Sequence, residues 1–184
     1  MFKKIKNAGD YRNKIVFGDR ATSNLSGKIN HHDIRIWGRE NLHETVEHVR
    51  YSPNLNVFCS VSSVKVYGPF FFAEPTVTGM LQLQQDIGRD FIFQQYGAIP
   101  HFHREVTSYV NRTVVAWIGC GKKIAWPPRS PDLTPLDFSM WGYFKHQVFV
   151  PSLLASLEEL RARITEAVAF IDADVIHGIW DEIA

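Results

Sequence analysis

The sequence has little of what would place it in several common classes of protein. It has two cysteines, Cys59 and Cys120, whose spacing matches neither a disulfide framework nor a zinc site. No apolar run approaches the roughly 18 residues of a membrane span, and the start MFKKIKNAGDYRNK lacks the apolar stretch of a secretory signal. We therefore expect a soluble intracellular protein with reduced thiols and no membrane partner.

An excess of charge of one sign is also lacking, because the net charge is only +1. The chain as a whole does not attract DNA, so contact with nucleic acid must depend on local groups of basic residues. Taken alone, each such group is equally consistent with solvated surface charge. The candidates lie near the start and beside a proline-rich segment: Lys3, Lys4, Lys6, Lys122, Lys123 and Arg129.

The composition fits one globular domain. With 184 residues, 45% of them hydrophobic and 13% aromatic, the chain is long enough to bury a core without disulfides or structural metals. We expect a single domain over residues 1–184, with a flexible lead-in at 1–13 and C-terminal helices at 152–184. No internal repeat divides it.

Local patterns predict strands and helices in mixed order. Runs rich in β-branched and aromatic residues, bounded by polar residues or proline, predict strands at Lys14–Phe17, Asn56–Val64, Lys65–Phe72 and Phe91–Tyr96. A capping box at Ser156–Glu159, followed by apolar residues at helical spacing, predicts the clearest helix. Further helices are predicted at Val77–Asp86, His103–Asn111, Leu136–Val148 and Asp174–Ile183.

The segment Trp126–Pro135 holds four prolines in ten residues. Proline removes backbone donors and restricts its neighbours, so this segment predicts a rigid, irregular connector. Asp137 follows it in the first turn of the next predicted helix, where the helix dipole favours a carboxylate. That position is consistent either with a stabilising acid or with a carboxylate held for chemistry.

Three segments closely resemble the active-site segments of mariner-like transposases, of the type dispersed through insect genomes. Ile15–Ala21 reads IVFGDRA and resembles the family strand F-S-D-E-A. Phe93–His101 reads FQQYGAIPH and resembles F-Q-Q-D-G-A-x-P-H, while Ser130–Phe138 reads SPDLTPLDF and resembles S-P-D-L-x-P-x-D-(F/Y). Shorter matching blocks in the same order extend the resemblance over about residues 14–150.

The resemblance implies both a fold and a chemistry. The fold would be α/β, a ribonuclease H-like mixed sheet flanked by helices. The family cleaves and joins DNA with two metal ions, Mg²⁺ or Mn²⁺, held by three carboxylates. Asp19 would be the first of these metal ligands and Asp137 the last, and both would be catalytic. DNA, a second copy of the chain or a full-length transposase subunit would be partners, and the location would be the nucleus.

The second acidic position of the family is occupied here by Tyr96. A phenol has an ordinary pKa of about 10, so it is neutral near pH 7 and is a poor ligand for magnesium. Arg20 stands where the family has Glu, which places a cation beside Asp19. The paired helix-turn-helix modules of the family also have no counterpart before Asp19. We therefore expect a nucleic-acid-binding domain with weakened metal binding and a defective active site.

Three alternatives stay open at this point. A substitute acid, Asp86, Asp90 or Glu105, would make the chain an active nuclease or transposase, although an offset of about 1 Å can already cost about a hundredfold in rate. The proline-rich segment would instead make it a protein-interaction module that presents an extended ligand. Finally, the chain would be a relic without any function.

Overall fold

The computed structural model describes the larger part of the chain, in segments. They are residues 9–27, 51–72, 85, 91–95, 108, 110–112, 114, 116–119, 124–126, 131–149 and 154–183.

A six-stranded mixed sheet forms the centre of the protein, with the strand order β3-β2-β1-β4-β5-β6. The first three strands are antiparallel neighbours, whereas β4, β5 and β6 continue the sheet in parallel from β1. This arrangement confirms the predicted α/β class and the mixed sheet. The strands are β1 (Ile15–Asn24), β2 (Asn54–Val61), β3 (Val66–Phe72), β4 (Ile92–Gln95), β5 (Ala116–Gly119) and β6 (Ile124–Ala125).

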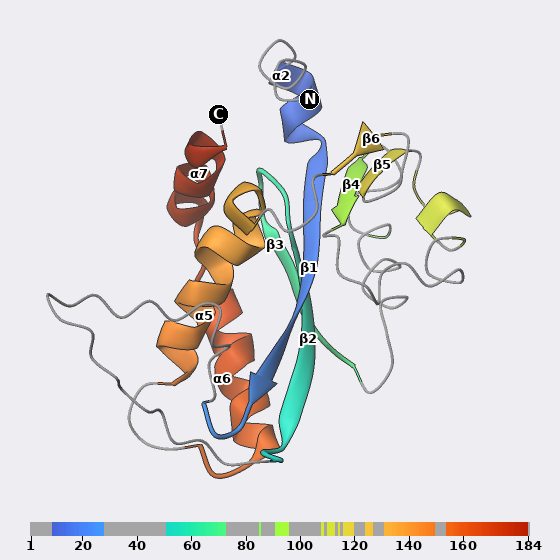
Figure 1. The fold of residues 1–184 in the computed structure, drawn as a ribbon. Helices are drawn as coiled ribbons and strands as arrows, with labels where there is room; N and C mark the ends of the chain where they lie inside the picture. The colour runs from blue at the N-terminus through green and yellow to red at the C-terminus, as the bar shows by residue number, and fades with distance from the viewer. Residues whose placement is uncertain are drawn as a thin grey trace, which may run out of the picture.

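Three helices, α5, α6 and α7, cover one face of the sheet (Figure 1). A short helix, α2 (Gly9–Asn13), precedes β1 and lies within the predicted lead-in. The covering helices are α5 (Trp141–Val148), α6 (Leu157–Ala169) and α7 (Ala173–Glu182).

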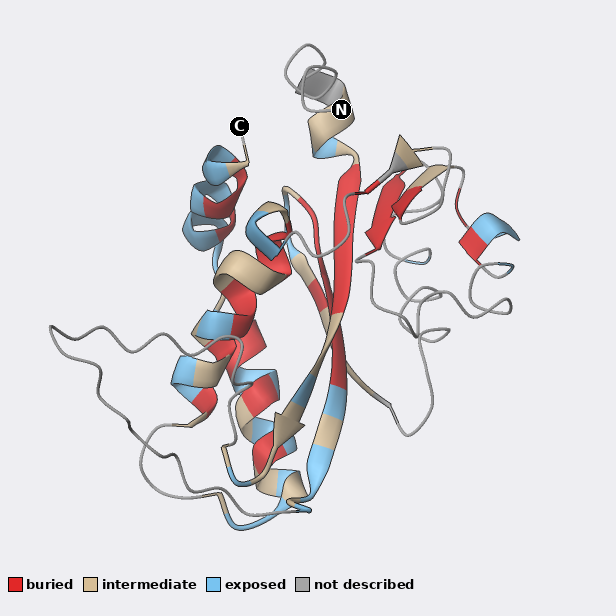
Figure 2. Ribbon diagram, in the orientation of Figure 1, coloured by how far each residue is buried: buried red, intermediate tan, exposed pale blue. Residues whose placement is uncertain are grey.

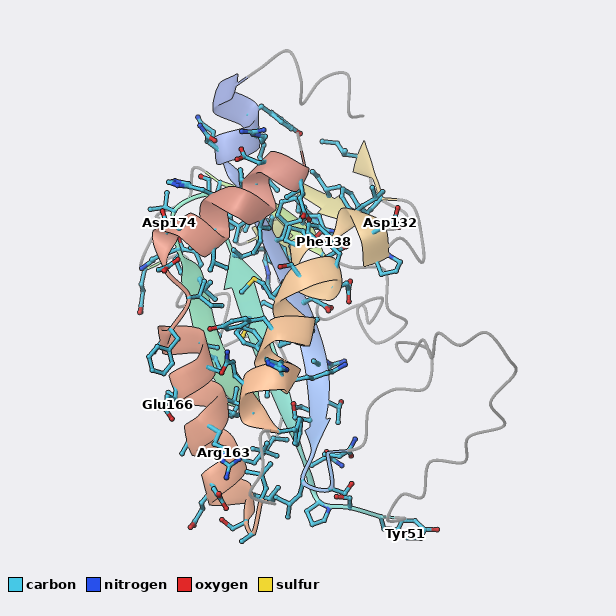
Figure 3. All side chains as sticks on the ribbon, turned by 90° about the vertical axis from the view of Figure 1, so that its left-hand side faces the viewer. Tyr51, Asp132, Phe138, Arg163, Glu166 and Asp174 are labelled. Carbon is cyan, nitrogen blue, oxygen red and sulfur yellow. The ribbon has the colours of Figure 1, made fainter. Side chains whose placement is uncertain are left out.

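Polar side chains fix the starts of α6 and α7. Ser156 Oγ accepts a hydrogen bond from the backbone N–H of Glu159, and the Glu159 carboxylate accepts one from the N–H of Ala155. The predicted capping box is therefore present, with its return bond directed one residue further upstream. Glu159 also forms an ion pair with Arg163, one turn further along α6, at 2.7 Å. Arg163, labelled on α6 in Figure 3, additionally donates to the carbonyl of Val148 and so ties α6 to the end of α5.

Apolar side chains pack on both faces of the sheet. Alternate residues of a strand point to opposite faces, so Ile15 and Phe17 face the helices while Val16 faces away from them. Figure 2 shows the first half of β1 and the inner sides of the helices as buried. The smaller cluster on the other face contains Val16, Phe58, Tyr67, Phe91, Phe93, Val110 and Val114.

The strand that carries Asp19 is longer than its hydrophobic pattern predicts. The expected strand ended at Phe17, whereas β1 continues to Asn24 because residues 17–24 pair with β2 throughout. Asp19 therefore lies within a strand and not at its end. Conversely, β2 stops at Val61, because Ser62 accepts hydrogen bonds from the N–H groups of Val64 and Lys65 and closes a turn.

Two predicted helices lie largely outside the described residues. Of Val77–Asp86 only residue 85 is described, and of His103–Asn111 the described residues 108, 110 and 111 are helical. None of the helices that the structure describes is both long and apolar enough to cross a bilayer.

Candidate active site

Asp19 lies at the point on β1 beyond which the strand pairs with β2 alone and no longer with β4. Gly18 is the last residue of β1 that pairs with β4, whereas the pairing of β1 with β2 runs on to Asn24. Asp19 follows Phe17 by two residues and so lies on the face covered by the helices. Its side chain is only 5% exposed. Within the described residues, a buried carboxylate thus stands at the carboxyl end of the paired β1 and β4 segments.

Two hydrogen bonds hold the Asp19 carboxylate. The indole N–H of Trp141 donates to Oδ2 at 3.0 Å, and the backbone N–H of Arg20 also donates to the carboxylate. Burial raises the pKa of Asp19 to about 6, because desolvation outweighs these two bonds and the charge of Arg20, all of which lower the pKa. Because side chains alternate along a strand, the Arg20 side chain lies on the opposite face of β1 from Asp19. Its charge therefore has the smallest of these effects on the pKa of Asp19.

Asp137 lies in the first turn of the helix that leads into α5, as predicted. A 3₁₀ helix (Pro131–Leu133) ends the proline-rich segment, and a π-helical turn (Leu136–Met140) follows it and runs directly into α5. Buried Thr134 fixes the junction, because its carbonyl accepts hydrogen bonds from the N–H groups of Asp137 and Phe138 at 2.9 and 3.1 Å. The Oδ2 atom of Asp137 is shielded from solvent.

The proline-rich segment acts as a connector where the structure describes it. Trp126 is 4% exposed and donates its backbone N–H to the carbonyl of Gly119, the last residue of β5. Thr134 and Pro135 are buried at the other end. Both described ends are therefore fixed within the domain. This burial fits a connector, because an extended segment that binds another protein needs no such anchoring.

The structure brings together the elements that carry Asp19 and Asp137. β1 contacts the π-helical turn, and Trp141, four residues after Asp137 on the same helix, reaches back to Asp19. Figure 3 labels Phe138, the neighbour of Asp137, where this helix begins. Carboxylate oxygens are the donors that Mg²⁺ and Mn²⁺ prefer, so the chemistry of this pair fits such an ion. The described residues contain no group of three or more His, Cys, Asp or Glu side chains that would hold a metal ion.

The third predicted position, Tyr96, lies outside the described residues. It follows Gln95, the last residue of β4, which pairs with Gly18 immediately before Asp19. The substitute acids that the sequence offered, Asp86, Asp90 and Glu105, also lie outside the described residues.

Two residues of the site were missed in the sequence. Trp141 lies within the predicted helix Leu136–Val148 but was not predicted to belong to the site, yet it is the hydrogen-bond donor to Asp19. Cys59 is fully buried on β2 and is the cross-strand partner of Asp19. Helical spacing from Asp137 places Trp141 one turn further on, but no local pattern predicts contact with a strand 122 residues away.

The fold of this chain is similar to that of solved structures of the Mos1 transposase. The chain matches a pre-cleavage Mos1 transpososome over 99% of its length, with a TM-score of 0.73 and 15% identity. The catalytic domain of Mos1 mariner transposase matches over 99% of this chain and 82% of that one, with a TM-score of 0.65 and 14% identity. The fold is that of the mariner transposase catalytic domain.

A third match to the mariner fold comes from a Mos1 paired end complex with Mn, with a TM-score of 0.72 and 16% identity over 99% of this chain and 55% of that one. The chain spans 56% of the length of the Mos1 chain in the transpososome. No model of a known protein family matches the sequence, and neither does any curated protein.

Proposed function

We propose that this chain is a mariner-like transposase domain that binds DNA and whose metal-dependent strand cleavage is disabled at position 96. The mariner catalytic fold and the placement of Asp19 and Asp137 on contacting elements support this function. The observation that carries the defect is Tyr96, which directly follows the strand paired with β1 beside Asp19.

The defect follows from the ligands that a hard cation requires. Asp19 and Asp137 would hold one Mg²⁺ or Mn²⁺, which when bound supplies Lewis-acid stabilisation of charge on the phosphate oxygens. A neutral phenol at position 96 contributes no anionic oxygen near pH 7. Two carboxylates in place of three therefore weaken metal binding, while the hydrogen bonds around Asp19 keep the rest of the site in order.

The proposal also covers the binding partners, the location and the domain boundaries of the chain. We propose DNA as the main ligand, a second copy or a full-length transposase subunit as a protein partner, and the nucleus as the location. A single domain over residues 1–184 is supported by the core, in which α6 and α7 pack with β1 and β2 around the same buried side chains.

Nicking of supercoiled plasmid DNA in the presence of Mn²⁺ tests this function. We expect no nicking by the unaltered protein or by Tyr96→Phe, and nicking by Tyr96→Asp that is lost when Asp19→Asn is added. If the unaltered protein nicks DNA and Asp19→Asn abolishes the activity, another ligand has replaced position 96 and the proposed defect is wrong. If Tyr96→Asp also fails to nick, the site is not disabled at a single ligand.

A further inference from the structure

The hydrogen bond from Trp141 to Asp19 joins the two halves of the candidate site. Asp19 belongs to β1 near the start of the chain, and Trp141 belongs to the helix that also carries Asp137. The bond is 3.0 Å long, and both side chains are buried, at 5% and 9% exposure. An indole N–H is a donor only, so it pairs with the carboxylate as an acceptor and offers nothing to a cation itself.

The surroundings of Trp141 hold its ring in place. The ring contacts Phe144, which lies three residues further along α5, in an edge-on arrangement at 5.6 Å between ring centroids. It also lines a small pocket with Ala21, Val57 and Ile164, which come from β1, β2 and α6. A donor fixed from several elements restricts the rotation of the carboxylate that accepts its hydrogen bond.

We propose that Trp141 is a positioning residue, whose indole N–H orients the Asp19 carboxylate toward the metal position shared with Asp137. This inference rests on the proposed function, because it assigns Trp141 a role at the same site. Trp141 does not touch metal or DNA in this role. Outer partners of a ligating carboxylate fix its orientation, and their removal typically lowers metal affinity by about 10–100-fold.

The protein supplies a matched control for removing an indole N–H. Trp180 is also buried, at 3% exposure, and its ring also packs edge-on against a phenylalanine, Phe17, at 5.8 Å. Its Nε1 atom, however, has no hydrogen-bond partner among the residues that the structure describes. Trp141→Phe and Trp180→Phe therefore remove the same atoms from buried rings, but only the first removes a bond to Asp19.

The test measures Mn²⁺ affinity by electron paramagnetic resonance in the full chain that carries Tyr96→Asp. We expect Trp141→Phe to weaken Mn²⁺ binding by about 10–100-fold and Trp180→Phe to change it less than about threefold. Equal effects of the two substitutions would overturn the inference. If Tyr96→Asp does not raise Mn²⁺ affinity above that of the unaltered protein, the proposed function fails instead.

A second measurement needs no metal and decides the inference in either case. The unfolding equilibrium is measured for Trp141→Phe, Asp19→Leu and the double variant, because leucine has a similar size and no hydrogen-bond acceptor. Hydrogen bonds to charged groups contribute enough that the two substitutions should be coupled by about tenfold or more in the unfolding equilibrium constant. Trp180→Phe combined with Asp19→Leu should be additive. Additive effects of Trp141→Phe and Asp19→Leu within about twofold would show that Trp141 does not hold Asp19.

Discussion

Asp19 and Cys59 lie directly opposite each other on the antiparallel strands β1 and β2, and both are buried. A carboxylate and a thiol are thus enclosed beside each other, and the charge of Asp19 adds to the desolvation that raises the pKa of Cys59. The burial of Asp19 should affect the pH dependence of stability, and the burial of Cys59 should affect the reactivity of its thiol.

The stability of the protein should depend on pH through Asp19. Burial raises the pKa of Asp19 from 3.8 to about 6, so the folded protein binds this proton more tightly than the unfolded chain does. The raised pKa of Asp19 contributes on the order of 3 kcal/mol to the free energy of unfolding. This contribution is complete below about pH 4 and is lost as the pH rises through about 6. Asp19→Asn should therefore be increasingly more stable than the unaltered protein between pH 4 and 7.

Urea denaturation at a series of pH values measures this difference. The comparison of the two proteins cancels other carboxylates, such as Glu159, whose pKa is lowered by hydrogen bonds from Ala155 and Arg163. Parallel stability curves for the two proteins would mean that Asp19 titrates normally.

The thiol of Cys59 should be inert in the folded protein. It is fully buried, and desolvation together with the nearby Asp19 carboxylate raises the pKa of the thiol, so the reactive thiolate is scarce. In a Cys120→Ser variant, in which Cys59 is the only thiol, a disulfide reagent should react only after unfolding. Reaction of the folded variant at the rate of the unfolded chain would contradict the burial of Cys59.

Gly18 should not tolerate a side chain. A Cβ atom at this position would lie 2.5 Å from the ring of Phe93 and 3.1 Å from that of Phe58, and Phe93 is fully buried. Gly18→Ala should lower the free energy of unfolding by about 1–3 kcal/mol through overpacking. Phe93→Leu should relieve part of this loss in the double variant.

Gly142 on α5 is the matched control for Gly18. A Cβ atom there would meet nothing within 4 Å, and the residue is exposed in a helix. Gly142→Ala should raise the free energy of unfolding by about 0.5–1 kcal/mol. Denaturation of both variants checks the pair, and equal effects at the two positions would refute the close packing at Gly18.

The start of α6 should depend on Ser156. Its hydroxyl accepts the N–H of Glu159, a group that otherwise lacks a partner within the helix. Ser156→Ala should cost about 1 kcal/mol of stability, and Ser156→Asp should retain most of it because aspartate also caps helices well. A loss with Ser156→Asp as large as that with Ser156→Ala would show that the cap is not the cause.

The sequence predicted the elements with strong local signals. The capping box and apolar spacing of α6, and the position of Asp137 in the first turn of a helix, depend on neighbours a few residues apart and were confirmed. The short strands β5 and β6 were not predicted. The second half of β1 was missed because Arg20–Asn24 carry little apolar character and become a strand only by pairing with β2.

The sequence predicts the acids of the candidate site, but it does not predict the residues that contact them. Asp19 and Asp137 were identified through the resemblance to mariner-like transposases, and the structure places them on elements in contact. The hydrogen bond from Trp141 and the cross-strand pairing with Cys59 depend on the register of β1 with β2 and on the docking of α5. Such contacts between distant segments leave no periodic signal in the sequence.

Mn²⁺ binding at position 96 tests the central claim most directly. Electron paramagnetic resonance titrations would compare the unaltered chain with Tyr96→Asp, Tyr96→Phe, and Tyr96→Asp combined with Asp137→Asn. If Tyr96 is the single missing ligand, only Tyr96→Asp should bind Mn²⁺ tightly, and Asp137→Asn should abolish the gain. Equal Mn²⁺ affinity in the unaltered chain and Tyr96→Asp would contradict the claim that position 96 disables the site.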